Sequence, residues 1–193
     1  MPLSTISEFV KKLAAIPKAE FTQDGVHRFL KAHPIDPETL QPYLHFRTSH
    51  YTRNLIDKNK LYEVIAICWE KGQISQVHNH KGQHCWMAVP IGKLLVQNFR
   101  VTAGNPDGGH CELAESDQYW MDPANPGRVE LDEPIHYVAN PAELNQRAVS
   151  IHIYSHPYDS CMVYSLERKQ ALEIPLHYSS EYGVWKEKEV ETV

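Results

Sequence analysis

The chain has 193 residues and a formal net charge of −5, with 42% hydrophobic and 22% charged residues. These values are ordinary for one globular domain with a full-sized core, so we expect no second domain. The negative charge and the absence of a Lys/Arg run argue against a nucleic-acid partner, because phosphates need clustered cations.

The cysteines and the N-terminus indicate where the protein works. Cys68, Cys85, Cys111 and Cys161 are scattered and form no CxxC pair, which disfavours a zinc ribbon and a disulfide scaffold. We expect Cys68 and Cys161 in the core or beside a site, and Cys111 as a loop or edge thiol. The sequence shows no signal peptide and no bilayer-spanning apolar run. These features predict a cytoplasmic protein without a membrane partner, either a monomer or a weak homo-oligomer.

A small helical cap is predicted over about residues 1–46. Thr5 and Glu8 have the spacing of a capping box, and apolar residues follow them at helical intervals. A second helical stretch follows Asp24. A third begins at Asp36 and is cut short by the second of the two prolines that follow.

From Tyr51 the pattern changes to short β-prone runs separated by turn residues. The runs are YTRNLI, LYEVIAICW, VHNH and CWMAVPIGKLLVQNFRV, then stretches near Cys111 to Leu113, Gly127 to Leu131, Ile135 to Val138 and Ala148 to Tyr154. Many short strands predict a mainly β sandwich or barrel, over about residues 47–165. The charged tail, about 166–193, is expected to supply an edge strand and a loose end.

Two histidines, His78 and His80, lie two positions apart in the stretch from Gly72 to Gly92. Residues i and i+2 of a strand point to the same face, so both imidazoles can reach one point in space. A catalytic metal site needs a third protein ligand, which one strand cannot supply. His136, at the start of a later predicted strand, is the candidate.

This spacing resembles the two motifs of the cupin superfamily, in which two histidines and a glutamate of the first motif join a histidine of the second around a metal. The resemblance implies a double-stranded β-helix, which is a jelly-roll-like barrel. This chain has Cys85 where the glutamate is common. Three neutral imidazoles leave a divalent metal its full charge, which favours a thiolate or carboxylate from the substrate. Imidazoles alone do not choose among Fe, Zn, Cu and Ni.

Two further segments carry polar residues on one strand face. Tyr51 and Arg53 share a face. Ser150, His152 and Tyr154 share another, while the apolar residues between them point the other way. In a small barrel such a face can line a lumen that holds a metal and its ligand. No acidic residue and no nucleophile elbow accompany Ser150, so this row is no serine-hydrolase triad.

Taken together, the segments resemble cysteine dioxygenase, a family of thiol dioxygenases within the cupins. The resemblance rests on YTRNL, CW, HNH followed by HC, and SIHIYS-x-P-x-D-x-C, in this order from Tyr51 to Cys161. It implies that His78, His80 and His136 hold Fe(2+). The implied reaction adds both oxygen atoms of O2 to the sulfur of L-cysteine and gives cysteine sulfinate.

The resemblance also implies roles for the polar rows. Arg53, with Tyr51 beside it, would bind the substrate carboxylate, since a guanidinium grips a carboxylate with two parallel hydrogen bonds. The implied catalytic side chains are Tyr154, positioned by His152 and Ser150, and Cys85. In this family, a cysteine and a tyrosine at the positions of Cys85 and Tyr154 can become joined by a thioether bond.

Three functions remain open at this point. The first is the iron-dependent dioxygenase, acting on L-cysteine or on another carboxylated thiol such as 3-mercaptopropionate. The second is a cupin isomerase or hydrolase that uses zinc or manganese, which would leave Arg53, Cys85 and Tyr154 without a joint explanation. The third is a non-catalytic small-molecule-binding cupin.

Overall fold

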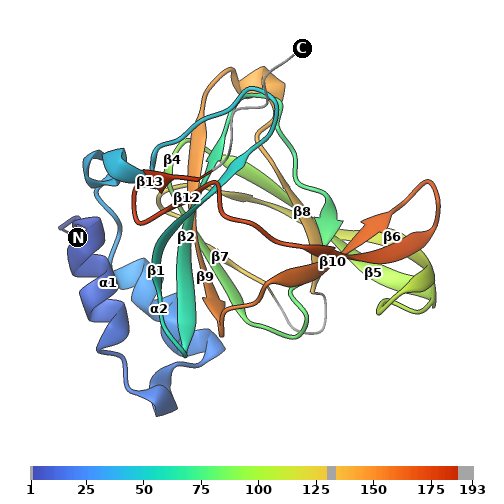
Figure 1. Cartoon of the computed structure of the whole chain (residues 1–193), viewed down its shortest axis with the longest axis horizontal. Helices are drawn as coiled ribbons and strands as arrows, with labels where there is room; N and C mark the ends of the chain where they lie inside the picture. Colours follow the sequence, from blue (N-terminus) through green and yellow to red (C-terminus); the bar gives the residue numbers. More distant parts are fainter. Residues whose placement is uncertain (1, 130–133, 187–193) are drawn as a thin grey trace.

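The computed structural model describes residues 2–129 and 134–186, which are mainly β-strands with helices on one side (Figure 1). The helices α1 (Ile6–Ala14) and α2 (Gln23–Ala32) lie beside β1 (Thr52–Lys58) and β2 (Tyr62–Trp69). In these two ranges no helix is long and apolar enough to cross a membrane.

Both predicted α-helices begin at a threonine cap. The Thr5 hydroxyl accepts a hydrogen bond from the Glu8 backbone, and the Glu8 carboxylate accepts one from the Thr5 backbone, so the predicted capping box is confirmed. The Thr22 hydroxyl caps α2 by accepting a hydrogen bond from the Gly25 backbone, so the helix begins before Asp24, which lies in its first turn.

The third predicted helix forms as a short 3₁₀ helix, η2 (Pro37–Tyr43). Asp36 is its N-cap, as expected, and Pro42 lies within its last turn. A proline has no N–H to donate, which suits a short helix better than a long one. The other 3₁₀ helices of the described residues are η1 (Lys18–Glu20) and η3 (Ala142–Leu144).

The strands form two sheets. The first has the order β13 (Val184–Trp185), β12 (Ser180–Glu181), β1, β2, β9 (Ala148–Ser155), β4 (Cys85–Ile91) and β7 (Gly127–Arg128). The second closes on itself in the order β10 (Ser160–Ser165), β11 (Gln170–Pro175), β6 (Gly109–Met121), β5 (Leu94–Gly104), β8 (Ile135–Ala139) and β3 (Val77–His78). The predicted fold class, a mainly β, cupin-type barrel, is confirmed.

Alternation along β9 assigns its two faces. Val149, Ile151 and Ile153 pack with apolar residues of α1 and α2 in one buried cluster. Tyr154 belongs to a second cluster on the opposite face, with Trp69 and Cys85. The helical cap therefore covers the outer face of the first sheet, and the inner face carries the polar row.

Several strand boundaries differ from the predictions. The long run beginning at Cys85 is divided at Gly92, whose φ is +78°, and a side chain there would lie 2.6 Å from a backbone oxygen. β6 extends far beyond the stretch from Cys111 to Leu113. Cys111 is buried among apolar side chains, so its assignment as a loop or edge thiol is wrong. Of the predicted stretch at 127–131, residues 130 and 131 lie outside the described residues.

The C-terminal segment contributes more structure than its composition suggests. β11 pairs with both β10 and β6, and β12 pairs in parallel with β1. The Ser180 hydroxyl donates to Asn54 Oδ1 over 2.8 Å, and both side chains are fully buried. This bond satisfies two polar groups that would be costly to bury alone, and it fixes the segment against β1.

Candidate metal centre

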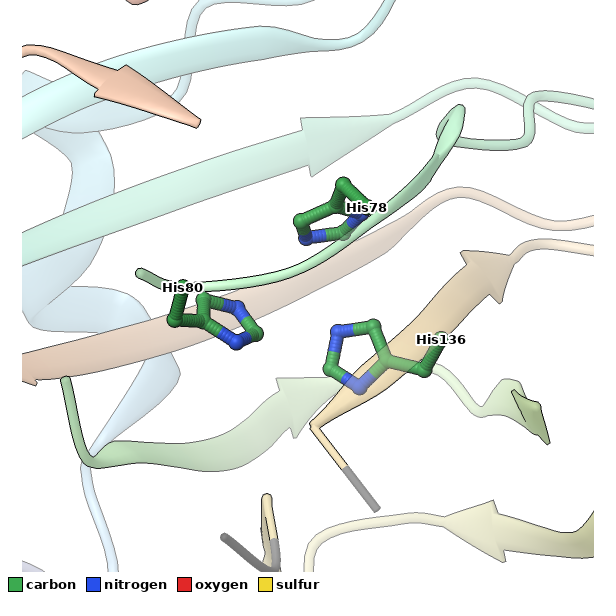
Figure 2. Close-up of side chains that lie close together, drawn as sticks. All are labelled: His78, His80 and His136. Carbon is green, nitrogen blue, oxygen red and sulfur yellow. The ribbon is translucent and has the colours of Figure 1, made fainter. Parts of the chain in front are cut away.

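Two strands of the closed sheet bring three imidazoles together (Figure 2). His78 on β3 and His136 on β8 are direct partners in an antiparallel register, so their side chains emerge side by side. His80 follows in the loop after β3. One ring nitrogen from each of the three residues lies within 4.8 Å of the others.

The hydrogen bonds of these rings suit a metal. His78 Nδ1 lies 2.8 Å from the Gln76 carbonyl oxygen, which fixes the ring and leaves Nε2 free. Both ring nitrogens of His80 and of His136 are buried without a hydrogen-bond partner. Buried polar atoms are rarely left unpaired, so a bound cation would explain these nitrogens. The residues present therefore fit a metal held by three imidazoles.

Burial keeps the imidazoles in the form that binds metal. It lowers the pKa of His80 and of His136 well below the usual value, with the neighbouring histidines adding to the effect. It also lowers the pKa of His78 to about 4. All three rings are therefore neutral at neutral pH, and a neutral ring nitrogen has the free lone pair that coordination requires.

A buried hydrogen-bond chain runs along β9 beside the histidines. Trp69 Nε1 donates to Ser150 Oγ over 2.9 Å, and Ser150 Oγ lies 2.8 Å from His152 Nε2. His152 Nδ1 lies 3.0 Å from the Tyr154 hydroxyl. Because the indole can only donate, Ser150 is free to donate onward to Nε2, and Nδ1 then donates to Tyr154. This direction leaves the Tyr154 hydroxyl proton available to a ligand.

Cys85 lies opposite this chain. It is the register partner of Tyr154 across β4 and β9, and its Sγ lies 4.0 Å from His152 Nδ1. Cys85 and Tyr154 are each 1% exposed. Burial raises the pKa of the Cys85 thiol and of the Tyr154 phenol, so both groups stay protonated at neutral pH.

Arg53 lies on β1, which β2 separates from β9, and Tyr51 lies just before β1. The Tyr51 ring stacks on Trp69 with 4.7 Å between ring centroids. Arg53 Nε and Nη2 are buried and have no hydrogen-bond partner. Burial and then the charge of Arg53 lower the pKa of His152 to about 3, so the guanidinium acts on the polar row. The inner face thus carries two unpaired donors near the imidazoles.

Three residues without a predicted role lie beside these groups. The Tyr158 ring lies 5.1 Å from Tyr154 and 6.4 Å from His80, measured between centroids. Glu63 is a fully buried carboxylate on β2, and Tyr178 donates a hydrogen bond to it. An acidic residue inside the apolar run LYEVIAICW was the available signal for Glu63.

Comparisons with known proteins extend over most of the chain. A family model described as cysteine dioxygenase type I matches residues 2–167. Cysteine dioxygenase type 1 of Homo sapiens is 26% identical over 166 residues, covering 86% of this chain and 80% of the relative. The enzyme of Danio rerio is 24% identical over 190 residues, covering 95% and 90%. The solved structure of TT1209 from Thermus thermophilus is 15% identical, covers 64% of this chain and 97% of its own, and has a TM-score of 0.46.

Proposed function

Because the chain belongs to the cysteine dioxygenase type I family, we propose that it oxidises L-cysteine to cysteine sulfinate with O2 at a ferrous iron. Family membership and the cluster of three histidines make it a metal-dependent thiol dioxygenase. We propose iron as the metal and L-cysteine as the substrate. The observation that supports it most is a buried, unpaired guanidinium beside three neutral imidazoles.

His78, His80 and His136 would hold the iron. Three neutral ligands leave coordination positions open, and among the described residues no carboxylate joins the three histidines to offset the charge of the cation. When bound, the iron supplies sites for the substrate thiolate and O2 and the electrons that activate O2. The protein's part is to hold the thiol and the oxygen in place and to keep water out, since His80 and His136 are each 1% exposed.

Arg53 would bind the substrate carboxylate. Its Nε and Nη2 are adjacent donors on one edge of the guanidinium, and both are buried without a partner. A carboxylate can accept from both at once, and such charge-assisted pairs are stronger than neutral hydrogen bonds. Leaving two buried donors unpaired costs free energy, so the substrate would satisfy groups that the fold leaves open.

Tyr154 would act as a hydrogen-bond donor to the bound substrate. Burial raises its pKa well above the usual value, so the phenol keeps its proton and is no base at neutral pH. With Ser150 and His152 donating along the chain, the Tyr154 hydroxyl would accept from His152 and keep its own proton for the substrate. Cys85 lies where it could form a thioether bond with the Tyr154 ring, a step that removes two hydrogens and needs O2 as oxidant.

Oxygen uptake tests the proposal directly. The protein is loaded with Fe(2+) without oxygen, mixed with L-cysteine, and then exposed to O2. We expect one cysteine sulfinate for each O2 consumed, and no consumption by a zinc-loaded sample. An iron-replete protein that consumes no O2 with L-cysteine would exclude the reaction. Running 3-mercaptopropionate in parallel decides whether it is the better substrate.

A further inference from the structure

Glu63 is the one buried carboxylate among the described residues, and the proposed reaction does not use it. It lies on β2, where its register partners are Tyr154 on β9 and Lys58 on β1. Tyr154 in turn pairs with Cys85 on β4. Glu63 therefore belongs to the same cross-strand row as two of the residues implied in catalysis, on the inner face of the sheet.

Two donors lie against the buried Glu63 carboxylate. Tyr178 Oη donates a hydrogen bond to Oε2, and Lys58 Nζ lies 3.8 Å from the same oxygen. Burial raises the pKa of Glu63 above its usual value, and the hydrogen bond from Tyr178 and the charges of Arg53 and Lys58 offset part of this rise. A carboxylate with no solvent exposure can keep its charge only when donors and cations surround it, as they do here.

Glu63 and Arg53 act on each other through charge and not through contact. In the described part of the chain, the two side chains form no ion pair with each other. Within the same residues, Glu63 Oε1 has no hydrogen-bond partner, and neither have Arg53 Nε and Nη2. The guanidinium thus keeps its donors for a ligand, while a negative charge nearby balances its positive one. A carboxylate ligand is attracted by Arg53 and repelled by Glu63, and an amine-bearing ligand gains attraction from Glu63.

We propose that Glu63 is a specificity-determining positioning residue, whose charge makes the site favour a thiol with both an amine and a carboxylate over a carboxylated thiol without the amine. This inference rests on the proposed thiol dioxygenase activity and deepens it. Both ligands would give a thiolate to the metal, so they differ only in their other groups. In cysteine a positive amine balances the negative carboxylate, whereas 3-mercaptopropionate has the carboxylate alone, which Glu63 disfavours.

The test compares three thiols in the iron-loaded protein and its Glu63→Gln variant. We expect the KM for 3-mercaptopropionate to fall and the KM for cysteamine, which has no carboxylate, to rise, each by about tenfold. The preference for cysteine over 3-mercaptopropionate should therefore fall. The kcat values for the three thiols should change little and by the same factor. Equal changes in KM for all three thiols, or none, would overturn the proposal.

Binding without turnover separates this inference from the reaction itself. Calorimetric titration of 3-mercaptopropionate and cysteamine into the iron-loaded protein, without oxygen, should show the same opposite shifts in Kd. This readout stands even if the wild type consumes no O2. Infrared difference spectra of wild type against Glu63→Gln should show an ionised Glu63 carboxylate at pH 7, and a protonated carboxyl band would contradict the inference.

Two further variants act as controls. Asp57→Asn removes a carboxylate from β1 that accepts a hydrogen bond from Tyr62, and it should leave the thiol preference as in wild type. An equal shift in Asp57→Asn would mean that overall charge, and not Glu63, sets the preference.

Tyr178→Phe is the variant to use if Glu63→Gln does not fold. It removes the hydrogen bond that favours the charged form of Glu63. Tyr178→Phe should shift the thiol preference in the same direction as Glu63→Gln, by a smaller amount. An unchanged preference would count against the proposal.

Discussion

Cys85 on β4 and Tyr154 on β9 face each other as direct partners in an antiparallel register. Directly opposed side chains in such a pair have Cβ atoms about 5 Å apart, which is close enough for a thioether bond after a small adjustment of the side chains. The two residues are far apart in the sequence, so only the pairing of β4 with β9 brings them together.

The first prediction concerns this pair. After turnover with iron, L-cysteine and O2, the denatured protein should lose the mass of two hydrogens, and peptide mapping should join the Cys85 and Tyr154 peptides. Cys85→Ala should show no such loss. Cys161→Ala is the matched control, because it removes another buried thiol and should leave the cross-link intact. A mass loss that persists in Cys85→Ala would assign the bond to other residues.

The second prediction concerns Arg53. Arg53→Ala should raise the KM for L-cysteine by about 10- to 100-fold, the loss expected for a charge-assisted pair of hydrogen bonds. The KM for cysteamine should change far less, because cysteamine has no carboxylate. Arg53→Lys keeps the charge but not the paired donors, so it should recover only part of the affinity. Equal effects on both thiols would remove the assigned role.

Local patterns in the sequence predict the metal-site histidines and the two faces of β9. Period-two alternation correctly assigns the two faces of β9, and the pair His78 and His80 converges although His80 lies beyond the end of β3. Both faces of β9 are buried, so the alternation separates an apolar face that packs against the helices from a polar face inside the barrel.

The parts that the sequence could not predict depend on distant contacts. Glu63 lies within the electrostatic reach of Arg53 because β1 pairs with β2, and it contacts Tyr178 because the C-terminal segment returns to β1. β12 is two residues long and polar, so no periodic pattern marks it. Its place is fixed by the buried bond between Ser180 and Asn54, a pairing that no local pattern reveals.

The third prediction concerns stability and pH in the metal-free protein. Burial lowers the pKa of His78 to about 4 and of His152 to about 3, below the ordinary value near 6.5. As pH falls from about 6.5 toward 4, the unfolded chain takes up these protons and the folded chain does not. The free energy of unfolding should therefore fall over this range, by on the order of a few kcal/mol.

Chemical denaturation at several pH values measures this change. His152→Gln should flatten the pH dependence, whereas His177→Gln, which alters an exposed histidine, should keep it. Binding of a divalent metal should add stability above pH 6.5 and lose this effect in acid, because protons compete for the same ring nitrogens. A metal-free protein equally stable at pH 6.5 and pH 4 would contradict the assigned protonation states.

The fourth prediction concerns the chain that ends at Tyr154. Ser150→Ala removes the hydroxyl between Trp69 Nε1 and His152 Nε2, which leaves two buried groups without a partner. The loss should cost about 1–3 kcal/mol of stability and, by freeing His152 to change its tautomer, lower kcat by about tenfold with little change in KM. Iron content should stay at the wild-type level, since Ser150 touches none of the three metal-site imidazoles among its described contacts.

Ser180→Ala is the matched control for Ser150→Ala, because it also deletes a fully buried hydroxyl, the one that donates to Asn54. It should lose a similar amount of stability without the change in kcat, since its bond fixes β12 and has no link to His152. If the two variants lower kcat equally, the effect of Ser150→Ala comes from loosened packing. If only Ser150→Ala lowers it, the hydroxyl acts through His152 on the orientation of the Tyr154 proton.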